Sequence, residues 1–150
     1  MDDSMDAVRQ VMLSINSIDG IYYFCARKLG VNENTLALLY ALSDGKTYSQ
    51  KQVCEEWLIP KTTINTIVRE LTEKGYISLE TEPHSREKHI QLTEAGTTYA
   101  QEILQGIFAA ERQAMEETMQ AYSPEAWNAL TFFSQRLCAL LRSHILDRKD

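Results

Sequence analysis

Hydrophobic residues recur every three or four positions over two long stretches of the chain, residues 8–29 and 127–145. Residues at this spacing fall on one face of a helix, so each stretch predicts a long amphipathic helix. The same pattern predicts shorter helices at residues 36–42 and 50–57, and another long helix at residues 94–120. Ser123, followed by Pro124, is expected to begin the last helix as its N-cap.

Residues 60–77, PKTTINTIVRELTEKGYI, predict a helix with two distinct faces. Apolar side chains fall within one arc of the helix, and polar side chains fall within the opposite arc. The apolar set is Ile64, Ile67, Val68 and Leu71, and the polar set is Thr62, Asn65, Thr66 and Arg69. Gly75 is a typical residue for the end of such a helix. We therefore expect one face to be buried and the other to be presented.

The short helix before it has a complete start signal. Ser49 is the expected N-cap, Gln52 closes a capping box, and Tyr48 and Val53 form the accompanying apolar pair. Two helices joined by a tight turn form a helix-turn-helix, whose second helix enters the major groove of DNA. The pattern thus predicts a helix-turn-helix that starts at residue 50 and ends near Gly75.

A β-hairpin is expected directly after these helices. Ile77 and Leu79 alternate with polar residues, the sequence EPHS supplies a turn, and Ile90 and Leu92 alternate again. Thr93 is expected to cap the helix that follows. A helix-turn-helix followed by a hairpin is a winged helix, so the predicted fold is mainly α with a small β-hairpin wing.

The exposed residue types suit the reading of DNA. Asparagine bonds the edge of adenine, arginine that of guanine, and threonine offers a methyl group to thymine. A wing arginine can enter a narrow minor groove, and lysines contact phosphates. The expected DNA-binding residues are Lys61, Thr62, Thr63, Asn65, Thr66, Arg69, Arg86 and Lys88. A polar helix face is also common in ordinary soluble proteins, and it is the adjoining hairpin that favours DNA binding.

Residues 35–104 resemble the multiple-antibiotic-resistance regulator (MarR) family of bacterial transcription factors. The resemblance is carried by QKQVCEEWLIPKTTINTIVRELTEKGYI and by HSREKHIQLTEAG. Its most specific parts are L-x-x-K-G-x-I at residues 71–77 and LTEAG at residues 92–96. The long flanking helices agree with the family in pattern rather than in motif.

The resemblance implies an obligate homodimer that binds pseudo-palindromic DNA, often as a repressor, and that is released by a small ligand or by thiol oxidation. It divides the chain into dimerisation helices at residues 1–31 and 94–150 and a winged helix-turn-helix lobe at residues 32–93. The two long apolar stripes also predict a dimer, because they exceed what one small lobe covers. In one respect the wing departs from the family, because His84 stands where an aspartate usually orients the arginine; Glu82 or Glu87 could take that role.

Composition narrows the class of protein further. A net charge of −6 argues against indiscriminate binding to nucleic acid, although residues 46–89 carry 7 basic and 7 acidic residues. The acidic start of the chain and the lack of a long apolar run favour a cytoplasmic protein. Cys25, Cys54 and Cys138 are far apart and are expected to be buried, reduced and inert.

Other site chemistries are less well supported by the sequence. By analogy with family members that bind aromatic acids, Tyr22, Tyr23 and Tyr40 are candidates to line a pocket for a small aromatic effector. His84 and His89 lack the clustered ligands of a metal site, so neither a metal nor another cofactor is expected. Enzyme motifs are likewise missing from the sequence. The alternatives left open are a winged helix that binds protein instead of DNA and a regulator that senses oxidants through a thiol.

Overall fold

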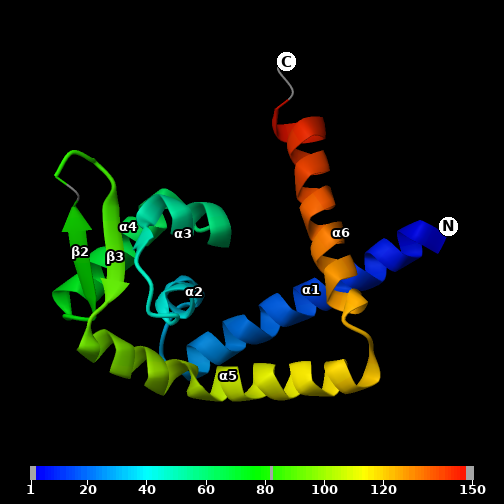
Figure 1. Ribbon diagram of the computed structural model, residues 1–150, viewed down its shortest axis with the longest axis horizontal. Coiled ribbons are helices and arrows are strands. Elements are labelled where there is room, and N and C mark those ends of the chain that lie inside the picture. The colour runs from blue at the N-terminus through cyan, green and yellow to red at the C-terminus, as the bar shows by residue number, and fades with distance from the viewer. Residues whose placement is uncertain (1–2, 82, 148–150) are drawn as a thin grey trace. The chain divides into compact units, whose positions relative to one another are not determined.

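The computed structural model describes residues 3–81 and 83–147, which form a mainly helical fold with a small antiparallel sheet (Figure 1). Its elements are α1 (Asp3–Lys28), α2 (Glu33–Leu42), β1 (Tyr48–Ser49), α3 (Gln50–Trp57), α4 (Lys61–Glu73), β2 (Ile77–Thr81), β3 (Lys88–Leu92), α5 (Glu94–Ala121), α6 (Glu125–Leu141) and a π-helical end, η1 (Arg142–Leu146). This confirms the predicted fold class, a mainly α chain with a winged helix-turn-helix.

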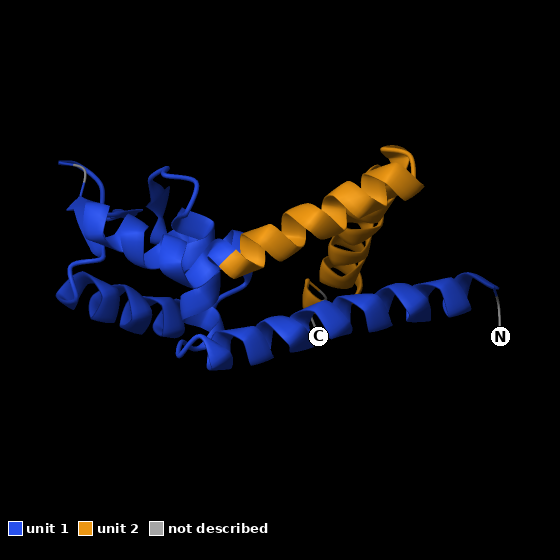
Figure 2. Cartoon of the chain, turned by 90° about the horizontal axis from the view of Figure 1, so that it is seen from below, with its two compact units in different colours: residues 1–105 blue, residues 106–150 orange. Residues whose placement is uncertain are grey.

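The chain divides into two compact units, residues 1–105 and 106–150, and α5 runs through the boundary (Figure 2). In the first unit α2, α3, α4 and the sheet form a lobe, and α1 extends away from that lobe as one long helix (Figure 1). The second unit contains the rest of α5, then α6 and η1. The functional division at residues 31 and 94 remains a separate prediction.

The helix-turn-helix is held by the core that its sequence predicts. Ile64, Ile67, Val68 and Leu71 of α4 are all buried, and so are Leu38, Leu39 and Leu42 of α2 and Val53 of α3. The capping box is present, because the Gln52 amide donates to the Ser49 hydroxyl at 3.1 Å and the Ser49 amide donates to the Gln52 side chain at 2.8 Å. Each fully buried aliphatic side chain contributes about 1.5–3 kcal/mol, so this core fixes the orientation of α4.

The wing is a three-stranded sheet in the order β1-β3-β2. The hairpin predicted from alternation is confirmed, with Leu79 opposite Ile90 and Ile77 opposite Leu92. The sequence did not reveal β1, in which Tyr48 pairs with Ile90. A strand of two residues is too short to alternate, and its second residue, Ser49, is also the N-cap of α3.

Close backbone packing joins the wing to α5 and explains the LTEAG sequence. The Thr93 hydroxyl donates to the Gly75 carbonyl at 2.6 Å and accepts from the Gly96 amide at 3.0 Å, which confirms Thr93 as a cap. A Cβ atom on Gly96 would overlap the Tyr76 carbonyl, so only glycine fits. The rings of Tyr76 and Tyr99 stack with their centroids 4.4 Å apart. These contacts tie the end of α4 to the start of α5.

Helix ends differ from the sequence-based expectations in several places. α1 begins at Asp3, ahead of its apolar stripe, and α2 begins at Glu33, where the Asn32 side chain accepts from the Thr35 amide at 2.8 Å. The prediction that Ser123 is the N-cap of the last helix is wrong, because α6 starts at Glu125 with Pro124 before it. Ser123 instead bonds the Glu125 carboxyl, which lowers the pKa of Glu125.

None of the helices in the described part of the chain is both long and apolar enough to span a bilayer.

Candidate nucleic-acid interface

The polar face of α4 is exposed along the helix. Lys61, Thr62, Asn65, Thr66 and Arg69 are exposed, whereas Thr63 is half-buried. Because the opposite face packs into the core, the helix cannot rotate to hide these side chains without exposing Ile64, Ile67 and Val68. A firmly held helix with an exposed polar face is suited to contact a partner surface.

A hollow of about 590 Å³ lies between α4, the start of α3 and the wing. We call it the wing-side hollow, and its lining is Ser49, Gln50, Lys51, Cys54, Glu55, Lys61, Asn65, Arg86, Glu87 and Lys88. It brings together four of the expected DNA-binding residues, which are Lys61, Asn65, Arg86 and Lys88. A smaller adjoining hollow of about 390 Å³ contains Arg69 together with Asn65 and Lys88.

Gln50, Lys51 and Glu55 line this hollow and were not predicted from the sequence to belong to a site. Gln50 and Lys51 form the first turn of α3, directly after the Ser49 N-cap. Their signal in the sequence was only the capping box, which locates the start of a helix but does not indicate what lies beside it. The approach of the wing makes these positions part of the same surface as α4.

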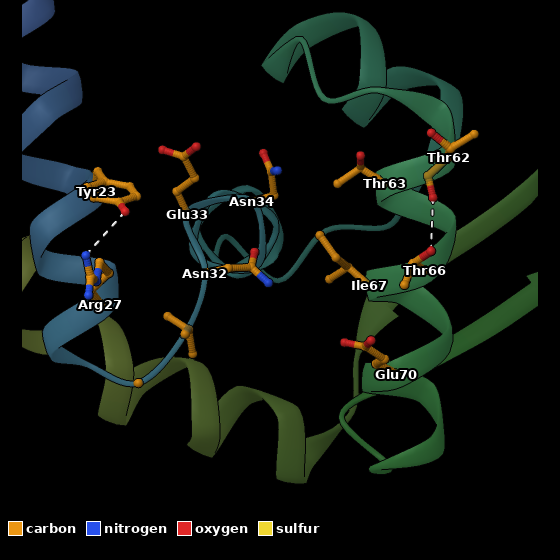
Figure 3. Close-up of a pocket in the computed structure, with 12 residues that line it drawn as sticks. Tyr23, Arg27, Asn32, Glu33, Asn34, Thr62, Thr63, Thr66, Ile67 and Glu70 are labelled. Atoms are coloured by element: carbon orange, nitrogen blue, oxygen red, sulfur yellow. Dashed lines mark hydrogen bonds between the residues drawn. The ribbon is translucent and has the colours of Figure 1, made fainter.

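A larger hollow of about 860 Å³ lies on the other side of α4. We call it the α1–α4 hollow. In Figure 3, Asn32, Glu33 and Asn34 lie between Tyr23 and Arg27 of α1 and the threonines of α4. The α4 residues that line it are Thr62, Thr63, Thr66, Ile67 and Glu70. The polar face of α4 is therefore divided, with threonines toward this hollow and Asn65 and Arg69 toward the wing.

Hydrogen bonding limits what Thr66 can offer a partner. Its hydroxyl donates to the Thr62 carbonyl at 3.1 Å, as the dashed line in Figure 3 shows. A threonine bonded in this way keeps an exposed methyl group and spare acceptor capacity, but its proton is already used. Contact with a thymine methyl group suits Thr66 better than donation to a base.

The three candidate effector-binding tyrosines occupy different surroundings. Tyr23 lines the α1–α4 hollow, and its hydroxyl accepts from Arg27 at 3.4 Å (Figure 3). The lining of that hollow includes neither Tyr22 nor Tyr40. Tyr40 packs against Trp57 with the ring centroids 5.3 Å apart. Tyr23 is thus the only one of the three that the structure brings to this hollow.

The cysteines are less uniformly buried than expected. Cys25 and Cys54 are half-buried, and Cys138 is exposed, so the prediction that all three are buried is wrong. Cys138 is accessible because α6 has no buried residue within the described chain. Burial raises the pKa of the Cys54 thiol, and nearby Lys61 opposes this shift. A raised pKa reduces the thiolate fraction, and hence the reactivity, of Cys54.

Across residues 3–81 and 83–147, no group of three or more His, Cys, Asp or Glu side chains is placed to hold a metal ion. In the wing His84 and Arg86 are exposed, and His89 is half-buried within β3. Glu82, one of the two residues that could take the place of the aspartate beside Arg86, lies outside the described residues. The other, Glu87, lines the wing-side hollow together with Arg86.

Comparison with known proteins identifies the lobe. Residues 29–86, which include the whole helix-turn-helix, match the model of the MarR family. The match covers the helix-turn-helix and part of the wing, so this part of the chain is similar to the MarR family. A comparison with curated proteins found no match.

Several solved structures share this fold over 85–95% of the chain. NMB1585, a MarR family regulator from Neisseria meningitidis, is 20% identical with a TM-score of 0.75, and the alignment covers 95% of this chain and 99% of that one. Reduced AbfR bound to DNA is 16% identical with a TM-score of 0.66, covering 93% and 98%. NadR in complex with 4-hydroxyphenylacetate is 14% identical with a TM-score of 0.68, covering 85% and 89%. At these identities the likeness concerns the fold alone.

Proposed function

We propose that this chain is a member of the MarR family and a homodimeric, sequence-specific DNA-binding regulator of transcription that represses from a pseudo-palindromic operator. The observation that carries the proposal is the exposed polar face of α4 beside the cations of the wing. The fold shared with AbfR, whose structure was solved bound to DNA, supports it. We further propose that the protein acts in the cytoplasm and has no enzymatic activity.

In this proposal α4 enters the major groove. Asn65 and Arg69 read base edges, and Thr62, Thr63 and Thr66 contact the groove through methyl and hydroxyl groups. Arg86 enters the minor groove from the wing, and Lys61 and Lys88 contact phosphates. The acidic surroundings of the lobe disfavour random DNA at long range, so specific contacts have to supply much of the affinity.

Uncovered apolar side chains support the homodimer. On α1, Ile18 is 55% exposed and Phe24 is 63% exposed, and on α6, Leu130 is 51% exposed and Phe132 is 66% exposed. Monomeric proteins rarely leave so many large apolar side chains in water. A second copy of the chain that packs on these helices would cover them and would present two copies of α4 to two half-sites.

We propose the α1–α4 hollow as the place where a small aromatic effector binds. Tyr23 offers a ring face and Arg27 offers a cation for a carboxylate, and NadR was solved in complex with the aromatic acid 4-hydroxyphenylacetate. An occupant of this hollow would also contact Thr62 and Thr66 of α4. Binding there would therefore compete with DNA for the same helix and release the operator.

Selection of bound fragments from a genomic library, followed by gel shifts with the selected site and a scrambled version, tests this function. We expect the selected fragments to share a pseudo-palindrome that the protein binds more tightly than the scrambled sequence. Failure to retain any DNA would favour a winged helix that binds another protein. Loss of binding on peroxide treatment, reversed by a reductant, would favour the thiol-based regulator instead.

A further inference from the structure

Four cationic side chains from different parts of the chain line the wing-side hollow. Lys51 belongs to the first turn of α3, Lys61 is the first residue of α4, Arg86 lies in the wing turn, and Lys88 begins β3. All four are exposed. Like charges around one concavity repel each other, so the arrangement gains stability when an anion enters.

Two carboxylates reduce this positive charge without cancelling it. Glu55 and Glu87 also line the hollow, so its charged side chains are four cations and two anions. The Lys51 ammonium lies 3.9 Å from the Glu55 carboxylate, and both side chains remain about two-thirds exposed, at 69% and 66%. An exposed pair of this kind is weak, because water screens the attraction between its charges. It can therefore open or be shared when a stronger anion arrives.

The hollow on the other side of α4 has the opposite balance. Its charged side chains are Arg27, Glu33 and Glu70, which are one cation and two anions. A helix in the major groove lies between two sugar-phosphate backbones, one on each side. The two hollows flank α4 in the same way, and only the wing-side hollow has an excess of positive charge.

From these observations we propose that the wing-side hollow binds the phosphodiester backbone of one DNA strand. Lys51 contacts a phosphate, and the Glu55 carboxylate competes with that phosphate for Lys51. This inference rests on the proposed function and deepens it, because it assigns the backbone anchor to one side of α4. It also gives Glu55 a role, since a carboxylate that competes with phosphate for Lys51 weakens binding to every DNA sequence. The affinity for random DNA is thereby kept low.

The first test compares Lys51→Gln and Glu55→Gln with the wild type, on the selected site and on scrambled DNA, over a series of salt concentrations. Lys51→Gln should weaken binding by roughly three- to tenfold on both DNAs and should lower the slope of log affinity against log salt by about one. Glu55→Gln should tighten binding on both DNAs. The ratio of the two affinities should stay unchanged in each variant.

Lys74→Gln is the matched control, because Lys74 is also an exposed lysine of the lobe but follows the other end of α4. We expect it to leave the salt slope within experimental error of the wild type. Circular dichroism and thermal melts of all three variants should match the wild type, since each change removes one exposed charge. A loss confined to the selected site in Lys51→Gln would mean that Lys51 reads a base, and the inference would be wrong.

The second test identifies the phosphate itself. Operator duplexes in which one phosphate at a time is replaced by a neutral methylphosphonate are bound to wild type and to Lys51→Gln. At the phosphate that Lys51 contacts, neutralisation should weaken the wild type several-fold and should leave Lys51→Gln nearly unaffected, because the contact is already lost. Equal losses in both proteins at every position would overturn the inference while leaving the proposed function intact. A wild type that binds no DNA would overturn the proposed function.

Discussion

At the scale of single residues, Asn65 and Arg69 project from the exposed face of α4 on the side of the wing. Asn65→Ala and Arg69→Ala should each cost roughly 1–3 kcal/mol of binding free energy on the operator and little on scrambled DNA, because base-edge contacts are lost. Arg86→Ala should instead weaken binding to both the operator and scrambled DNA. It should also lower the slope of log affinity against log salt by about one. Fluorescence anisotropy at several salt concentrations separates the two patterns. Equal losses on both DNAs for the α4 variants would mean that this helix contacts only the backbone.

Thr66 allows a second prediction at this scale. Its hydroxyl already donates to the Thr62 carbonyl, so Thr66→Val keeps the exposed methyl group and should change operator affinity by less than about 1 kcal/mol. Thr66→Ser removes the methyl group, keeps the hydroxyl, and should weaken binding where a thymine lies beside it. The same anisotropy assay measures both variants. A larger loss for valine than for serine would show that the hydroxyl contacts DNA.

At the scale of elements, the close packing of the wing against α5 depends on Gly96. A Cβ atom there would overlap the Tyr76 carbonyl, so Gly96→Ala should lower the free energy of unfolding by roughly 1–3 kcal/mol. Gly106 lies in the same helix, and a Cβ atom added there would have no atom within 4 Å apart from its chain neighbours and the nearby backbone of the helix itself, so Gly106→Ala should raise the free energy of unfolding by about 0.5–1 kcal/mol. Urea denaturation at a single protein concentration compares the two. A Gly96→Ala protein as stable as wild type would show that the packing of α5 against Tyr76 does not require glycine at this position.

At the scale of the whole molecule, dimerisation should depend on the apolar side chains of α6. Leu130 is half exposed in the single chain, so Leu130→Asp should cost the fold of one copy little. It should nevertheless place an unpaired charge in the proposed interface, and breaking a buried contact in this way costs several kcal/mol. Light scattering should report a dimer for the wild type and a monomer for the variant, with operator binding lost. Asn128→Asp, an exposed change on the same helix, is the control and should remain dimeric. A wild-type monomer would end the dimer proposal.

Local signals in the sequence predicted the elements of the lobe well. The capping box located α3, the separation of apolar from polar residues located α4 and its buried face, and strict alternation located β2 and β3. Two features with only a weak local pattern, a short strand and the turn after α3, were not predicted. β1 has only two residues, and α3 ends in the left-handed conformation at Leu58, with φ 51°, where a glycine would have marked the turn.

By itself the sequence determined that α4 has a buried and an exposed face and that a basic hairpin follows it, because helical and strand periodicities are local properties of the chain. Only the tertiary structure decided which polar side chains share a surface. Lys51 and Arg86 meet at one hollow because β3 pairs with β1 just before α3, which brings the wing beside the first turn of that helix. Likewise, the threonines of α4 face α1 and α2 rather than the wing because the core fixes the rotation of α4. Contacts between residues far apart in sequence depend on how the elements pack, and no local periodicity encodes that packing.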